Sequence, residues 1–252
     1  MKLIKSLIIL ITTQFLIGQD TQDFLPLSLQ LDNNIVRESV VLPTVDVDEL
    51  KAEDERLSHL KRLRFGYEHE LNQDFFEAAN EFTFEDNRVF LLQLFSYDAY
   101  ALRAIFEPFY LPEGVNLFIY NNDMSQLEGA YTNNNNNDAS FFSTPLIEGE
   151  RIVIELNVPR GIDLSDIELE ISTIIHDYLG LQNIMNSNSD RACGANILCE
   201  DADPYLDQIN AVAWLDMGGY ICSGAMINKS INIEYGKVTA AVIKQEGKQF
   251  RV

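Results

Sequence analysis

The chain has 252 residues, of which 46% are hydrophobic, so it is long enough to form one large domain or two modest ones. Its 39 acidic and 18 basic residues give a formal net charge of −21. This charge argues against nucleic acid as a partner, because phosphate binding needs clusters of lysine and arginine. It also disfavours adsorption to anionic membranes, and a strongly solvated surface is the simplest interpretation.

The first residues have the pattern of a secretory signal peptide. Lys2 and Lys5 form a positive start, and an apolar run follows before Gly18. That run is too short to span a membrane, and no later stretch has the roughly 18 unbroken apolar residues that a membrane helix needs. We therefore predict a signal peptide over 1–19 and a secreted, extracellular protein without a membrane span, in a compartment that permits disulfides.

Residues 20–64 are predicted to be a pro-region that contains one surface helix, over 45–64. Asp46 and Asp48 lie in its first turn and basic residues lie in its last, which complements the helix dipole. A narrow stripe of leucines on an otherwise charged helix indicates that it lies on a surface. The segment 39–43 before it is predicted to be an edge strand or extended linker, because its terminal proline cannot occupy a central strand.

From Phe65 onward the apolar period changes to two, which is typical of β-strands. Short strands separated by Gly, Pro and Asn turns predict a β-sandwich or barrel, here over 65–178, followed by a linker over 179–192. The asparagine run 133–137 is predicted to be an exposed, mobile hairpin loop whose side chains do not pack. The predicted strands are 88–95, 101–107, 116–120, 141–144, 151–157 and 167–175.

The strand cores and turns of this β region come in a distinctive order. The segments are Phe95-Ser96-Tyr97-Asp98-Ala99, Phe109-Tyr110-Leu111-Pro112-Glu113-Gly114, Leu117-Phe118-Ile119-Tyr120, Gly129-Ala130-Tyr131-Thr132, Phe142-Ser143-Thr144-Pro145, Ile147-Glu148-Gly149-Glu150 and Ile152-Val153-Ile154-Glu155. In this order they resemble the pro-region of secreted bacterial trypsin-like serine proteases of the lysyl endopeptidase kind. The resemblance implies a mainly all-β fold, with a jelly-roll-like β-sandwich pro-domain that precedes a peptidase.

The stretch from Cys193 to Asn228 carries a second set of motifs. It contains Cys193-x5-Cys199, then Asn210-Ala-Val-Ala-Trp214, and finally Cys222-Ser-Gly-Ala-Met-Ile-Asn228. These motifs resemble the first strands of the catalytic domain in the same family, where the Cys-Ser-Gly-Ala strand leads to the catalytic histidine. The resemblance predicts that 193–252 is the truncated N-terminal part of a trypsin-like peptidase domain, an incomplete chymotrypsin-like β-barrel segment.

The catalytic groups of that family do not follow these motifs. In the family the next strand ends in Thr-Ala-x-His-Cys, whereas neither histidine nor cysteine follows Thr239-Ala240 here. A triad needs a histidine base, a carboxylate that orients it and a nucleophilic serine. The chain's histidines, His59, His69 and His176, all precede the protease-like segment. We therefore predict no catalytic residue and no peptidase activity for this chain, and a structural or solvent-exposed place for each histidine.

The chain's three cysteines, Cys193, Cys199 and Cys222, are the disulfide candidates. By the resemblance, each is the first half of a disulfide whose other half belongs to the later barrel. The alternative is a disulfide between Cys193 and Cys199, in which case Cys222 has no cysteine partner in this sequence. Ser223 resembles a framework serine and not the nucleophile. Three cysteines without a nearby histidine make an incomplete zinc site, so no metal is predicted there.

No cofactor is predicted, and calcium is the alternative considered. The acidic turns 121–123, 136–138 and 200–203 contain carboxylates, but none has the spacing of an EF-hand loop. Solvated turns are the simpler interpretation of all three segments.

A rival function is that of a stand-alone secreted β-sandwich that binds protein or carbohydrate. Aromatic residues such as Phe141 and Phe142 beside the asparagine run would serve such binding, although packing in the core explains them better. In the leading hypothesis, a protein or peptide substrate is expected only for an intact enzyme.

Overall fold

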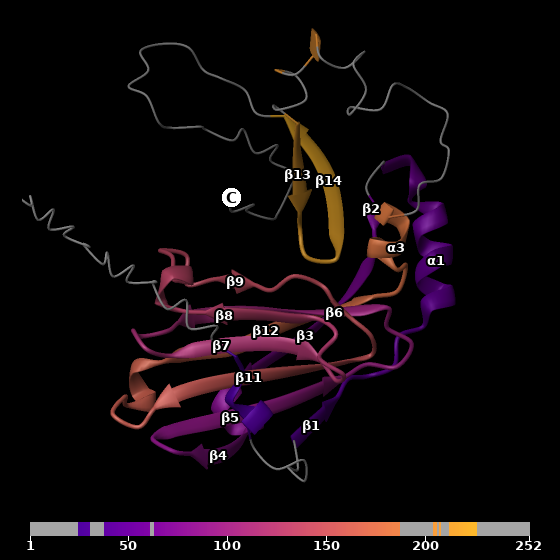
Figure 1. The fold of residues 1–252 in the computed structure, drawn as a ribbon. Helices are drawn as coiled ribbons and strands as arrows, with labels where there is room; N and C mark the ends of the chain where they lie inside the picture. Colours follow the sequence, from indigo (N-terminus) through magenta and orange to yellow (C-terminus); the bar gives the residue numbers. More distant parts are fainter. Residues whose placement is uncertain are drawn as a thin grey trace, which may run out of the picture.

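The structure is a computed structural model that describes residues 25–30, 38–60, 63–186, 204–205, 207 and 212–225. In this part of the chain two β-sheets pack face to face, and a smaller third sheet stands at one end of them (Figure 1). The architecture confirms the predicted all-β sandwich. Short 3-10 turns connect its parts: η1 Leu27–Gln30, η2 Ser58–Leu60, η3 Asn133–Asn135 and η4 Leu164–Asp166.

The first sheet has β5 and β11 at its centre. β11 pairs with β5 on one side and with β7 on the other, and β8 extends the sheet beyond β7. The short strand β1 runs parallel to the end of β5, as the predicted edge strand, while β4 pairs with the start of β5. The strands are β1 Glu38–Val41, β4 Asn80–Phe84, β5 Asn87–Phe95, β7 Asn116–Asn121, β8 Leu127–Tyr131 and β11 Arg151–Pro159.

The second sheet is built on β6 and β12. β12 lies between β6 and β3, and the two short strands β9 and β10 pair with the other edge of β6. The ladder of β12 shifts register around Ser172, as at a β-bulge. The strands are β3 Gly66–Asp74, β6 Ala101–Tyr110, β9 Phe142–Ser143, β10 Ile147–Glu148 and β12 Glu168–Asp177.

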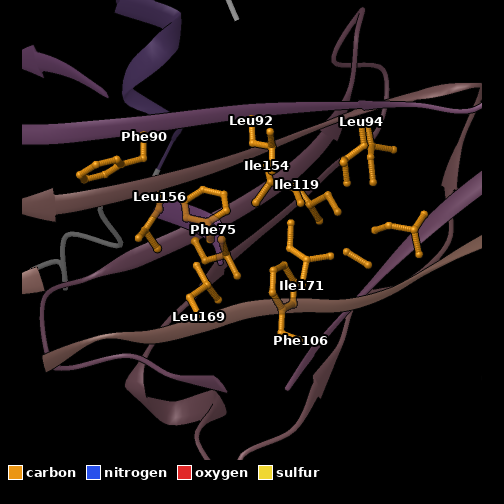
Figure 2. Packing of buried hydrophobic residues seen from close by; sticks show 14 of the residues in the cluster. Phe75, Phe90, Leu92, Leu94, Phe106, Ile119, Ile154, Leu156, Leu169 and Ile171 are labelled. Atoms are coloured by element: carbon orange, nitrogen blue, oxygen red, sulfur yellow. The ribbon is translucent and has the colours of Figure 1, made fainter. Parts of the chain in front are cut away.

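The space between the two sheets is filled by apolar side chains. Figure 2 shows Leu92, Ile119 and Ile154 of the first sheet facing Phe106 and Ile171 of the second, and each of these is fully buried or nearly so. The short helix α2 Phe75–Ala78 closes one side by placing the Phe75 ring in the same core. Because each strand alternates its side chains between two faces, this single layer anchors the strands of both sheets.

The predicted strands agree with the observed ones where the sequence is strongly apolar. The segments 88–95, 116–120 and 151–157 correspond to β5, β7 and β11. β6 continues to Tyr110, beyond its predicted end, and β3, β4 and β8 were not predicted as strands. Strands β3, β4 and β8 are partly exposed, and polar residues occupy some of their more buried positions. The alternation of apolar and polar residues that indicates a strand is therefore weak in their sequences.

The helix predicted over 45–64 is shorter in the structure. α1 covers Val47–Arg56, and its surface character is as predicted, since none of its residues is buried. Asp46 is its N-cap, because the Asp46 carboxylate accepts the amide of Glu49 at 2.9 Å. The basic end of the predicted helix instead forms β2 Leu63–Arg64. Pairing with another strand supplies backbone hydrogen bonds there, and this tertiary contact outweighs helix propensity.

The prediction that the asparagine run 133–137 does not pack is wrong. The Asn136 side chain accepts the Leu111 amide at 3.0 Å and donates to the Leu111 carbonyl at 2.8 Å, like a strand neighbour. Asn135 accepts the amide of Thr132 at 2.9 Å and so completes a capping box around η3. The carboxamide carries both a donor and an acceptor, which lets it replace a backbone peptide.

The third sheet contains β13 Val212–Asp216, β14 Tyr220–Ala225 and β2, in that order. It is open within the described ranges, and residues 226–252 lie outside them. The helix α3 Leu181–Asn186 falls within the predicted linker and begins on the buried residue Leu181. Among the helices that the structure describes, none has the length and apolarity needed to cross a membrane.

Candidate functional site

The three histidines occupy two different environments. His59 is exposed on η2, where its Nδ1 lies 3.3 Å from the Arg56 carbonyl. His69 and His176 lie on the neighbouring strands β3 and β12 and are 6% and 0% exposed, with ring centroids 6.1 Å apart. The register places His176 opposite Leu102 of the core. The structure therefore brings two of the histidines together, inside the sandwich.

His176 has a serine partner that the sequence did not indicate. Ser96 Oγ and His176 Nδ1 are 2.7 Å apart, the separation of a nucleophile and its base. Both residues are 0% exposed, so a substrate cannot reach them. Burial, with His69 nearby, lowers the pKa of His176 to about 4, and burial also lowers the pKa of His69. At neutral pH both rings are uncharged members of the core.

Asp177 does not orient His176. Its carboxylate accepts the amides of Leu179, Gly180 and Leu181 at 3.0, 2.8 and 2.8 Å and so begins α3. Burial raises the pKa of Asp177, and these amide hydrogen bonds oppose the rise. The adjacent pair His176-Asp177 thus turns the chain and does not form part of a triad, whose carboxylate must contact the imidazole.

A second polar cluster lies at the surface, where α1 meets the end of β12. Arg64 Nε donates to Asp54 at 2.9 Å and to the Tyr178 hydroxyl at 3.1 Å. Its Nη2 donates to Glu53 at 2.7 Å and to the Leu50 carbonyl at 3.1 Å. The Tyr178 hydroxyl in turn donates to the second oxygen of Asp54. This Arg64 cluster ties α1 and β2 to the sandwich.

The Arg64 cluster is held in one protonation state. Burial disfavours the charge of Arg64, but hydrogen bonds to Glu53 and Tyr178 outweigh it, and the net effect raises the pKa of Arg64. Burial and the hydrogen bond to Asp54 raise the pKa of Tyr178. Neither group exchanges a proton near neutral pH, so the cluster is suited to fastening elements together and not to acid–base catalysis.

Beside the Arg64 cluster, hairpin β13–β14 joins the sandwich (Figure 1). Tyr220 and Ile221 of β14 pair with Arg64 and Leu63 of β2. At the hairpin turn, the Gly219 carbonyl accepts the amides of Phe65 and Gly66 at 2.9 and 3.0 Å. The Gly219 amide donates to the Glu68 carboxylate at 3.1 Å. The contact is made mainly by backbone atoms.

A cleft of about 410 Å³ opens along this junction. Its walls come from α1, from β2, and from Leu179 and Tyr220 on either side. Charged residues of both signs line it: Lys51, Asp54, Glu55 and Arg64. We take the junction of α1, β2 and the hairpin as the candidate functional site, since it joins the two sets of family-like motifs.

Sequence reasoning did not identify Arg64, Glu68 or Tyr178 as members of a site. One signal was available for the hairpin, because Gly218-Gly219 separates two short apolar runs. Gly218 has a φ of +80°, which the first central position of a type II′ turn requires and which glycine adopts readily. The polar contacts join residues far apart in the chain and leave no local pattern.

Of the disulfide candidates, Cys193 and Cys199 lie outside the described residues. Cys222 is exposed on β14, opposite Leu215 of β13, and the next pair in the ladder is Ser223 with Trp214. The disulfide pairing therefore stays a prediction.

Some side chains of the turns considered for calcium have other partners in the described residues. Asp123 is used locally, because its Oδ1 accepts the Ser125 amide at 3.1 Å and the Ser125 hydroxyl at 2.8 Å. Asn136 is held by Leu111, as described above. No group of three or more potential ligands is found among the described residues, and the segment 200–203 lies outside them.

Of the two aromatic residues considered for ligand binding, Phe142 packs in the sandwich. The Phe142 ring packs on Phe109 and Tyr131, with centroids 4.7 and 4.6 Å away, at the edge of the core. Phe142 thus belongs to the sandwich, as the simpler interpretation proposed.

Comparison with known families identifies the region that carries these features. The model of the lysyl endopeptidase N-terminal domain matches residues 41–178, more than half of the chain. The match begins at the last residue of β1 and ends at Tyr178, so it includes the sandwich and the Arg64 cluster. No curated protein and no solved structure matches the chain.

Proposed function

This chain belongs to the lysyl endopeptidase N-terminal domain family, and we propose that it is the N-terminal part of an exported trypsin-like serine endopeptidase precursor. The observation that carries the proposal is the position of hairpin β13–β14. The matched region ends at Tyr178, and a hairpin with the Cys222-Ser-Gly-Ala motif follows and rests on it. The sandwich acts as a pro-region that holds the start of the peptidase domain.

The chain as given has no peptidase activity in this proposal. Its buried Ser96–His176 pair is closed to substrate, and the exposed His59 has its Nδ1 beside the Arg56 carbonyl. Purified chain should release no product from lysine- or arginine-containing peptide substrates. Cleavage that a serine-directed inhibitor abolishes would contradict this part of the proposal.

The pro-region role is tested with a separate lysyl endopeptidase. The mature enzyme is denatured and then diluted into buffer with or without an equimolar amount of this chain, and recovered activity is measured. A pro-region should raise the yield of active enzyme or, added to the folded enzyme, lower its activity. An unrelated acidic protein of similar net charge serves as the control, because −21 charges alone can affect aggregation. No effect beyond this control in either assay would refute the proposal.

A further inference from the structure

The turn of hairpin β13–β14 fits against the sandwich without any side chain between the two backbones. A Cβ at Gly219 would lie 2.3 Å from the Gly66 carbonyl oxygen, and one at Gly218 would lie 2.8 Å from Glu68 Oε1. A Cβ at Gly66 would lie 2.4 Å from Ile175 Cγ2, which is a contact within the sandwich and not with the hairpin. The Glu68 side chain is able to move away from Gly218, whereas the Gly66 oxygen is part of the backbone, so the close approach depends on glycine at position 219.

Directional polar contacts add to this fit. The Gly219 carbonyl accepts two amides, from Phe65 and Gly66, while its amide donates to the Glu68 carboxylate. Glu68 is part of β3 and so belongs to the family-matched sandwich. A hydrogen bond to a carboxylate is stronger than one between neutral groups. The sandwich therefore provides hydrogen-bond partners for both the backbone amide and the backbone carbonyl of Gly219.

The strand next to the turn continues the contact. Tyr220 and Ile221 form a ladder with β2, and Ile221 packs on an apolar cluster at this end of the sandwich. The buried members of that cluster are Phe65, Ala101, Leu146, Ile175 and Leu181. Backbone pairing at a strand edge, together with a pocket for one side chain, is the general mode of β-strand addition.

We propose that β2, Gly66 and Glu68 form a recognition site through which the pro-region holds the first β-hairpin of the peptidase domain. The partner that this site fits is a hairpin with a Gly-Gly turn, an apolar residue two positions after the second glycine and no bulky group at the turn. The inference rests on the proposed function. An isolated hairpin is marginally stable in water, so a preformed edge that pairs with it supplies a template for the later barrel strands.

In the described ranges, β2 pairs with the first two residues of β14 only. The site therefore anchors the hairpin at its turn. This geometry agrees with assistance in folding.

Hydrogen exchange of the full chain, read by mass spectrometry, tests the site. In the parent chain, peptides from 212–225 should exchange slowly. Gly219→Ala should speed their exchange by at least about tenfold, because the added methyl group breaks the close approach. Peptides from 87–177 should keep their protection and show that the sandwich stays folded. Gly161→Ala is the matched control, since a Cβ there meets no atom within 4 Å.

Glu68→Ala gives an independent test that does not alter the hairpin. It should speed exchange of the hairpin by roughly threefold to tenfold through loss of the carboxylate acceptor. Glu70→Ala, an exposed residue of the same strand, makes the same charge change away from Gly219 and should have no effect. Equal exchange of 212–225 in the parent, Gly219→Ala and Glu68→Ala chains would overturn the site.

The refolding assay separates failure of the site from failure of the proposed function. If the parent chain assists the enzyme and Glu68→Ala, which alters the site itself, assists it about equally well, the recognition site is wrong while the pro-region function stands. Loss of assistance in Glu68→Ala, with Glu70→Ala unaffected, supports both. If the parent chain has no effect, the proposed function fails, and the site as a recognition element for a peptidase fails with it.

Discussion

The sandwich and hairpin β13–β14 are both β-structure, but different forces hold them. In the sandwich, side chains from two sheets bury one another, and residues such as Phe106 and Ile154 are 0% exposed. The hairpin is held at its turn by backbone hydrogen bonds, by glycines that permit contact, and by the carboxylate of Glu68. The stability of the sandwich depends on the volume and apolar area of its buried side chains. The position of the hairpin depends on the close fit of two backbones and on the geometry of their hydrogen bonds.

This difference separates the molecule into a self-sufficient part and a dependent part. The sandwich contains its own core, so its stability does not require the hairpin. The hairpin has two strands and gains its position from the sandwich. Mutations should therefore affect the two regions unequally. The hydrogen-exchange variants test the dependent part, and three measurements test the forces that hold the self-sufficient part.

The largest effect is expected for Phe106→Ala. The Phe106 ring is 0% exposed and packs beside Phe109 and Phe142, with centroids 6.1 and 6.4 Å away. The resulting cavity should lower the free energy of unfolding by about 3–5 kcal/mol. Urea unfolding followed by far-UV circular dichroism measures this loss. Tyr110→Ala on the same strand, where the side chain is exposed, should cost less than about 1 kcal/mol. Similar losses for both variants would show that core volume does not govern the sandwich.

The next effect concerns pH and the buried His176. Its pKa is about 4 in the folded chain, because of burial and of His69, against an ordinary value of 6.5. Between these values the unfolded chain binds more protons than the folded one, so stability falls as the pH falls from 6.5 towards 4. Loss from this group should reach up to about 3 kcal/mol and should be absent above pH 6.5. Asp98 and Glu150 favour the charged ring and so oppose the lowering of the His176 pKa, and the value of about 4 already includes their effect.

The comparison with His176→Gln isolates this loss from the other titrations of an acidic chain. Urea midpoints are measured for both chains between pH 7 and pH 4. The parent should lose more stability than the variant over this range, so that their difference narrows in acid. His59→Gln, on the exposed turn η2, should run parallel to the parent. Parallel curves for the parent and His176→Gln would contradict the assigned effect.

The smallest of the three effects is expected at the Arg64 cluster. Arg64→Ala removes donors to Asp54, Glu53 and the Leu50 carbonyl, which should cost about 2 kcal/mol. Amide exchange of α1 should rise, while that of β5 and β11 should change little. Arg88→Ala breaks the more exposed pair with Glu81 and should cost less than about 1 kcal/mol. A larger loss for Arg88 than for Arg64 would show that the cluster does not fasten α1.

Much of the sandwich was predictable, because its central strands are nearly continuous apolar runs. β5, β7 and β11 followed from that pattern. The helix was predicted from the acidic residues at its start, although it begins at Val47, two residues later than predicted, with Asp46 as its N-cap. The helix end was not predicted, because the pairing of Leu63 and Arg64 with β14 involves residues over 150 positions later.

The candidate site was predictable only in part. The Cys222-Ser-Gly-Ala motif pointed to the hairpin, but the residues that receive the hairpin, Gly66 and Glu68, lie in an ordinary-looking strand. The sequence likewise contained no sign that Ser96 would meet His176, 80 positions away. In each case the partners are distant in the chain, and only the pairing of strands brings them together.

The amino-acid sequence by itself determined the all-β class, the surface helix and the family of this chain, because alternation, the charges at the helix ends and motif order are local properties. Tertiary structure alone decided which histidines are buried, that an asparagine side chain acts as a strand neighbour, and that hairpin β13–β14 rests on β2. Each of these outcomes depends on contacts between residues that are far apart in the chain. Burial and hydrogen-bond partners follow from those contacts, and no local sequence pattern encodes them.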